Sequence, residues 1–266
     1  MLTYLSFIVL GIFAGFLAGL LGIGGGLIIV PFLSFVFALQ GSVAPEYVMH
    51  LALGTSLTSI IFTSISSTAA HHRRGAILWP VWLRIVPGIL IGTFAGSRVA
   101  AYLPTNFLKV FFAFFLYYVA FRMIRSKKTQ AGRDLPGRTG MLAAGSGIGF
   151  VASWVGIGGG TLSVPFLSWC SVELHKAIGT SAAIGLPIAL AGAVGYATAG
   201  LGKAGLPPYS LGFVNLAALL FIVLGSVATA PLGARVAHSL PVPRLKKFFA
   251  VLLLVLGTRM WVSVFI

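Results

Sequence analysis

The stretch that decides the fold is Gly22-Ile23-Gly24-Gly25-Gly26-Leu27-Ile28-Ile29-Val30-Pro31-Phe32-Leu33-Ser34. It returns half a chain later as Gly156-Ile157-Gly158-Gly159-Gly160-Thr161-Leu162-Ser163-Val164-Pro165-Phe166-Leu167-Ser168. Three consecutive glycines cost a helix about 1 kcal/mol each relative to alanine. Inside a membrane, the exposed backbone must be satisfied by protein, water or a ligand. A glycine break at corresponding positions in two halves of a membrane protein is a pointer to a transporter's binding site.

The composition is that of a membrane protein. Of the 266 residues, 58% are hydrophobic and 8% are charged, whereas soluble domains carry about 25% charged residues. The apolar runs are long and continuous rather than alternating, which favours helices over a transmembrane barrel. We therefore expect an all-α polytopic membrane protein in contact with a lipid bilayer.

The charge is strongly biased, with a net value of +15 and only three acidic residues, Glu46, Asp134 and Glu173. Most of the Lys and Arg are interpreted as loop charges that set topology. No soluble domain is expected, so nucleic-acid binding is not predicted. Because no carboxylate lies within an apolar run, a carboxylate proton relay or cation site in the membrane is not expected. This favours an anionic or neutral solute.

Ten apolar segments can be read along the chain. The first half contains segments at about 4–21, 24–39, 48–70, 78–101 and 106–124, and the second half contains 141–155, 158–169, 177–199, 211–237 and 245–265. In the first segment, Gly11, Gly15 and Gly19 recur every four residues, which predicts close approach of another helix. The only polar linker of any length separates a first repeat at 1–124 from a second at 140–266, with a basic cytoplasmic linker at 125–139.

Further landmarks recur in the same order in both halves. Gly54-Thr55-Ser56 corresponds to Gly179-Thr180-Ser181, and Leu103-Pro104 corresponds to Leu240-Pro241. These matches indicate an internal duplication. The basic loops change place between the halves, which favours two repeats of inverted topology; a parallel four-plus-four arrangement is the rival. Ten full spans, six spans with two re-entrant hairpins, and intermediate counts near eight stay open.

The glycine turns are the first candidate site. A new helix is expected to begin near Gly25 and near Gly159, and helix starts carry unpaired N–H groups and partial positive charge. Two such starts facing each other would bind an anion without a buried cation. The alternative is that the glycines only permit tight helix packing.

The hydroxyl pairs Thr55-Ser56 and Thr180-Ser181 are the second candidate, because hydroxyls can donate hydrogen bonds to an oxyanion. The alternative is back-bonding to the carbonyl of the preceding helical turn. Thr63, Ser64 and Thr68 extend a hydroxyl-rich face in the first half, which indicates a wet path or a polar seam between helices.

The duplicated glycine block, the Gly-Thr-Ser that follows it, and the Gly-x-Arg-x-Ala and Leu-Pro that close each half resemble the TauE/SafE family, which is described as sulfite exporters. The resemblance covers nearly the whole chain. It implies a carrier of the bacterial inner membrane for a small sulfur-containing anion such as sulfite, sulfoacetate or another organosulfonate, passive or coupled to a proton or sodium gradient. The residues that match the family's motif are Gly24, Gly25, Gly26, Thr55, Ser56, Gly158, Gly159, Gly160, Thr180 and Ser181.

No catalytic constellation, cofactor site or metal site stands out, so an enzyme is not predicted. The function expected is a secondary anion transporter that works by alternating access. An anion channel of the same architecture and a non-transporting membrane subunit are the alternatives. The anion, the direction of transport, the coupling ion and a homodimeric state are left open.

Overall fold

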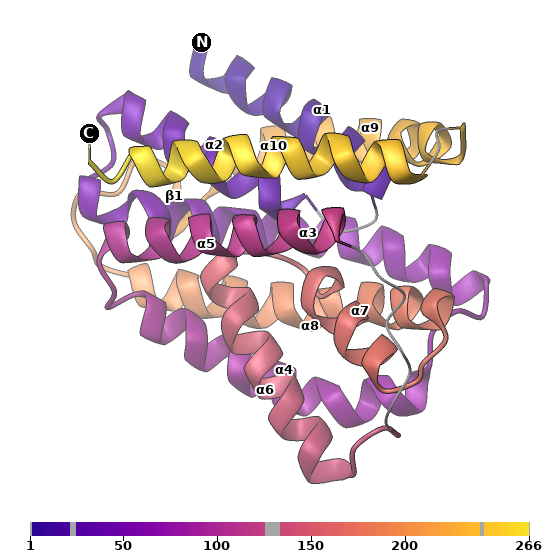
Figure 1. The fold of residues 1–266 in the computed structure, drawn as a ribbon. Coiled ribbons are helices and arrows are strands. Elements are labelled where there is room, and N and C mark those ends of the chain that lie inside the picture. The colour runs from indigo at the N-terminus through magenta and orange to yellow at the C-terminus, as the bar shows by residue number, and fades with distance from the viewer. Residues whose placement is uncertain (1, 22–24, 126–133, 240–241, 266) are drawn as a thin grey trace.

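The computed structural model describes the chain except for residues 1, 22–24, 126–133, 240–241 and 266 (Figure 1). In these described parts the chain is almost entirely helical, which confirms the all-α class. The helices of the first half are α1 (Leu2–Leu21), α2 (Gly26–Gln40), the short 3-10 helix η1 (Pro45–Tyr47), α3 (Val48–Arg73), α4 (Trp79–Ala100) and α5 (Thr105–Ile124). Those of the second half are α6 (Arg138–Val155), α7 (Gly160–Trp169), α8 (Leu174–Gly200), α9 (Leu216–Ser239) and α10 (Val242–Val262).

Helix length separates full membrane spans from partial ones. In the described residues, four helical segments are long and apolar enough to cross a membrane: Pro45–Arg73, Trp79–Ala100, Thr105–Ile124 and Leu174–Gly200. The helices that follow the glycine blocks are shorter: α2 has 15 residues and α7 has 10. At about 1.5 Å per residue, α7 is about 15 Å long, which is half of a hydrocarbon core of about 30 Å. These lengths favour partial crossings at the glycine blocks over ten full spans.

The helices of the two halves are interleaved. The first helix of each half packs along the fourth helix of the other, α1 on α9 and α4 on α6. Two further large contacts join corresponding helices, α3 with α8 and α5 with α10, and Figure 1 shows α10 running alongside α5. The helix α4 also packs on α8, and its counterpart α9 packs on α3. Exchanging the halves therefore maps this pairing onto itself. The opposite membrane orientation of the repeats stays a prediction.

Glycine makes the close helix contacts between the halves possible. A Cβ atom added at Gly11 would lie 2.5 Å from the backbone oxygen of Ile222 in α9, and one added at Gly15 would meet the backbone of Ser226. The predicted small-residue stripe of the first helix is thereby confirmed at these two positions. In the same way, Gly92 of α4 packs on the backbone of Ser146 in α6. Without side chains at these positions, dispersion contacts extend over the helix backbones themselves.

A short hairpin that the sequence reading missed precedes α9. It pairs β1 (Ser210–Leu211) with β2 (Val214–Asn215), antiparallel. This stretch falls in the segment expected to be helical from 211, and the helix starts at Leu216 instead. The central linker predicted at 125–139 lies largely outside the described residues.

Candidate functional site at the two glycine turns

Both helices that follow the glycine blocks begin without a side-chain cap. Gly25 precedes α2 and Gly159 precedes α7, and neither position has a side chain that could accept an N–H hydrogen bond. The first described backbone bonds in these helices run from Ile28 N–H to the Gly25 oxygen at 3.0 Å and from Ser163 N–H to the Gly159 oxygen at 2.8 Å. The N–H groups before them belong to the first helical turn, which a helix cannot pair internally.

The structure brings the two glycine blocks into direct contact. A Cβ atom at Gly26 would collide with the backbone oxygen of Gly156 and would lie 3.0 Å from Cα of Ile157. The Ser56 hydroxyl donates a hydrogen bond of 2.9 Å to the same Gly156 oxygen. Gly156 ends α6 with φ of 63°, a left-handed conformation that favours glycine. Predicted site residues of one half thus contact the glycine turn of the other.

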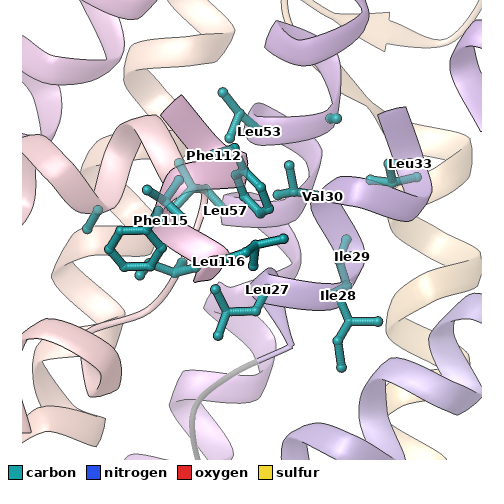
Figure 2. Close-up of a cluster of buried hydrophobic side chains, with 14 of the residues drawn as sticks. Leu27, Ile28, Ile29, Val30, Leu33, Leu53, Leu57, Phe112, Phe115 and Leu116 are labelled. Carbon is teal, nitrogen blue, oxygen red and sulfur yellow. The ribbon is translucent and has the colours of Figure 1, made fainter. Parts of the chain in front are cut away.

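The start of α2 is embedded in apolar side chains. Leu27, Ile28 and Ile29 are at most 4% exposed, and they belong to the cluster of Figure 2, which also contains Leu53 and Leu57 of α3 and Phe112, Phe115 and Leu116 of α5. At this end, close packing accounts for Gly26. Gly25 is buried but has more space, because an added Cβ would meet only the tip of Ile29, at 3.0 Å, and the Ala14 oxygen, at 3.6 Å.

The second glycine turn packs against α8. A Cβ atom at Gly159 would lie 2.7 Å from the backbone oxygen of Ser181 and 3.2 Å from the backbone nitrogen of Gly185. At Gly158 the nearest atom would be Cγ2 of Ile60, at 3.6 Å, an ordinary contact distance. Gly158 and Gly159 are buried, whereas Gly160 at the start of α7 is half-buried. Gly24 lies outside the described residues.

The threonines of the two Gly-Thr-Ser motifs have the same structural partners in the two halves. Thr55 is fully buried, and its hydroxyl oxygen accepts a 3.0 Å hydrogen bond from the N–H of Asn215, just before α9. Thr180 is equally buried and accepts a 2.9 Å hydrogen bond from the N–H of Leu78, just before α4. Each threonine therefore holds the start of the fourth helix of the opposite half.

The glycine before each threonine permits this contact. A Cβ atom at Gly54 would collide with the Phe213 oxygen, and one at Gly179 would collide with the Ala76 oxygen. Backbone therefore meets backbone at both places. The back-bonding that the sequence left open is seen instead at Thr58, whose hydroxyl donates to the Gly54 oxygen at 2.8 Å.

Replacing Thr55 or Thr180 by valine is expected to destabilise the protein by about 1–3 kcal/mol, because a backbone N–H then loses its acceptor. Thermal unfolding of the purified protein in detergent measures the effect. Thr58→Val is the matched control, since its loss leaves no N–H group unpaired, and we expect a change below about 0.5 kcal/mol. Equal midpoints for all three variants would contradict a bridging role of the two threonines.

The serines of the motifs differ between the halves. Ser56 is bonded to Gly156, but the Ser181 hydroxyl, which is 1% exposed, has no hydrogen-bond partner among the described residues. Ser163 is fully buried, and its hydroxyl has no hydrogen-bond partner among the described residues either. The hydroxyl oxygen of Thr161 is likewise buried without such a partner. The sequence reading missed Thr161 and Ser163. The signal was available, because they occupy two of the few positions at which the glycine-rich copies differ, opposite Leu27 and Ile29.

Comparisons with known proteins cover nearly the whole chain. The family model described as sulfite exporter TauE/SafE matches residues 7–260. A probable membrane transporter protein of Haemophilus influenzae is 37% identical over 257 residues, which cover 96% of this chain and 97% of that protein. The probable membrane transporter protein YdhB of Bacillus subtilis is 27% identical over 252 residues, covering 91% of each chain. A third, from Methanocaldococcus jannaschii, is 27% identical over 255 residues, covering 95% of this chain and 93% of that protein. No solved structure matches significantly.

Proposed function

Because this chain belongs to the sulfite exporter TauE/SafE family of membrane transporters, we propose that it is a secondary transporter for a small sulfur-containing anion. The substrate class is sulfite or an organosulfonate such as sulfoacetate. The membrane is the bacterial inner membrane. Transport proceeds by alternating access of one central site to the two sides, driven by the anion gradient alone or coupled to protons or sodium.

The observation that carries this proposal is the pair of uncapped helix starts at the glycine turns. α2 and α7 both begin after glycine with no side-chain acceptor, and the two turns touch at Gly26 and Gly156. Free N–H groups and the positive end of a helix dipole favour an anion at such a place. An anion bound there would satisfy amides that otherwise have to be satisfied inside the protein.

The scarcity of carboxylates supports an anion over a cation. Glu46 lies in η1 at the first turn of the Pro45–Arg73 span, Glu173 lies just before α8, and Asp134 lies between the halves. The residues that contact the glycine turns are glycine, serine and apolar residues, and these carry no charge. Hydroxyl and amide donors bind an oxyanion but offer no compensating charge to a cation.

Alternating access is supported by the way the two halves meet. Corresponding helices pair across the interface, α3 with α8 and α5 with α10. The hydrogen bonds from Asn215 to Thr55 and from Leu78 to Thr180 link each half to the start of a helix in the other. Small sliding movements along these contacts would expose the glycine turns to one side at a time.

Reconstitution into liposomes tests the proposal. We expect uptake of labelled sulfite or sulfoacetate above that of protein-free vesicles, and little uptake of taurine at a pH at which its amine is charged. A pH or sodium gradient, imposed separately, identifies the coupling ion. Preloaded unlabelled substrate should accelerate entry of the label, because a carrier exchanges its substrate. Flux without exchange would favour a channel, and absence of flux for every anion would contradict transport.

A further inference from the structure

We propose that the anion is bound asymmetrically, at the second glycine turn, by the hydroxyl groups of Ser163 and Ser181 together with the free amides at the start of α7. This inference rests on the proposed anion transport and adds to it the residues and the donor chemistry of the site. It differs from a site shared equally by both glycine blocks. Three observations lead to it.

The first observation is that two buried serine hydroxyls lack a hydrogen-bond partner among the described residues. Ser163 is 0% exposed and Ser181 is 1% exposed, and within the described part of the chain neither hydroxyl has a hydrogen-bond partner. Burying a hydroxyl without a partner is unfavourable, because its hydrogen bonds to water are lost and not replaced. A serine in a helix can usually avoid this cost by bonding the carbonyl of the preceding turn, as Ser34 does with Pro31 in α2. Ser163 and Ser181 do not.

The second observation is that the two serines come from helices that contact each other at the second glycine turn. Ser163 follows Gly159 by four residues, so the two positions lie on one face of the turn leading into α7. Gly159 itself lies against the backbone of Ser181 and Gly185 in α8, at the distances given above. That face of α7 is therefore directed at the part of α8 that carries Ser181. The Thr161 hydroxyl in the first turn of α7 is also buried without a partner among the described residues, but Thr161 lies two positions from Ser163 and therefore on another side of the helix.

The hydroxyl-rich face of α3 reaches the same place. The Ser64 hydroxyl oxygen lies 2.9 Å from where a Cβ of Gly185 would be. One turn further along, the Thr68 hydroxyl donates to the Ala182 oxygen at 3.4 Å. Polar groups of the first half thus approach the second glycine turn through α8, and Gly185 provides the space for them.

The third observation is the contrast with the first glycine turn. The positions that correspond to Thr161 and Ser163 are Leu27 and Ile29, which pack into the apolar cluster of Figure 2. The position that corresponds to Ser181 is Ser56, whose hydroxyl is already bonded to the Gly156 oxygen. The second copy of the motif therefore carries side-chain hydroxyls without a partner among the described residues. The matched positions of the first copy carry two apolar side chains and one hydroxyl that is already bonded.

This donor set selects for the chemistry of the ligand. Sulfite and sulfonate groups present several negatively charged acceptor oxygens around one sulfur atom, and serine hydroxyls and backbone amides can each donate to one of them. Hydrogen bonds to a charged group are stronger than neutral ones. No titratable side chain takes part, so the site binds its anion by donation alone.

Binding and stability measurements on two pairs of serine-to-alanine variants test the proposal. Ser163→Ala and Ser181→Ala should each weaken binding of sulfite and sulfoacetate to the purified protein about tenfold, measured by titration calorimetry. The same variants should leave the thermal midpoint of the ligand-free protein unchanged or raise it, because they remove an unpaired buried hydroxyl. Ser34→Ala is the control for affinity, since its hydroxyl is bonded to Pro31, and it should bind as wild type does.

Ser56→Ala is the control for stability, since it occupies the same repeat position as Ser181 but loses a real hydrogen bond, and its midpoint should fall. Wild-type affinity in both Ser163→Ala and Ser181→Ala would overturn the asymmetric site while leaving anion transport intact. A midpoint of Ser181→Ala as low as that of Ser56→Ala would assign it a structural bond and overturn its role. If the wild-type protein binds neither sulfite nor sulfoacetate, the proposed substrate class itself is wrong.

Discussion

Replacing Gly26 by alanine is expected to destabilise the protein by about 3 kcal/mol or more and to remove most of the folded protein from detergent extracts. The new methyl group would collide with the Gly156 carbonyl oxygen and lie 3.0 Å from Cα of Ile157. Both obstacles are backbone atoms of the opposite half, so no side-chain rotation relieves the clash. Overpacking costs about 1–3 kcal/mol where the surroundings can adjust, and more where they cannot.

A second glycine-to-alanine substitution, at a helical position with free space, is the matched control. Gly147→Ala introduces the same methyl group in α6, where none of the described residues beyond the local helix backbone and the two chain neighbours comes within 4 Å of the added Cβ. We expect it to be neutral or to stabilise by up to about 1 kcal/mol, because alanine is the better helix former. Thermal midpoints and the monodisperse fraction on size-exclusion chromatography compare the two variants. A Gly26→Ala protein as stable as Gly147→Ala would show that the glycine blocks are not in contact.

Transport should fall at least about tenfold in Gly158→Ala, although the protein remains folded. An added Cβ at Gly158 would lie 3.6 Å from Ile60 and 4.0 Å from Gly185, so the structure accommodates it. The methyl group would, however, stand beside the amides at the start of α7 and keep an anion from approaching them. Losing one donor of an anion site costs about 1.5–3 kcal/mol, which corresponds to a tenfold or larger effect.

Gly25→Ala is the partner experiment at the first turn, where the nearest atom among the described residues is the tip of the Ile29 side chain, at 3.0 Å. If the anion is held by the second turn, Gly25→Ala should reduce uptake less than Gly158→Ala does. Initial rates in liposomes, normalised to inserted protein, provide the comparison. Wild-type rates in both variants, with intact folding, would remove the glycine turns from the transport site.

These two sets of experiments distinguish glycines of the repeated block that are needed for close packing from glycines that are needed for anion binding. Gly26 is close-packed, as the packing interpretation of the glycines predicts, whereas Gly158 has room for a methyl group. The choice between packing and anion binding, which the sequence posed for each block as a whole, therefore has to be tested residue by residue. Substituting every glycine of a block together would confuse loss of folding with loss of transport.

Several features could be predicted from the chain alone because they depend on local pattern. Long apolar runs with few charges specify membrane helices, and the predicted segments coincide with the helices to within a few residues except near the hairpin before α9. The repeat of the glycine block, of Gly-Thr-Ser and of Leu-Pro indicates the duplication. Helix starts at Gly25 and Gly159 follow from the poor helix propensity of consecutive glycines, and the resemblance to the family followed from the same motifs.

Other features depend on which distant residues meet, and no local pattern encodes that. Thr55 and Ser56 are neighbours in sequence, yet one binds the end of strand β2 before α9 and the other the turn after α6. Ser56 and Ser181 occupy equivalent positions, yet only Ser56 has a partner among the described residues. Whether a buried hydroxyl is bonded, and whether a glycine has space around it, is set by atoms a hundred residues away. Folding brings those atoms together, and the packing they form determines which groups remain free to bind a ligand.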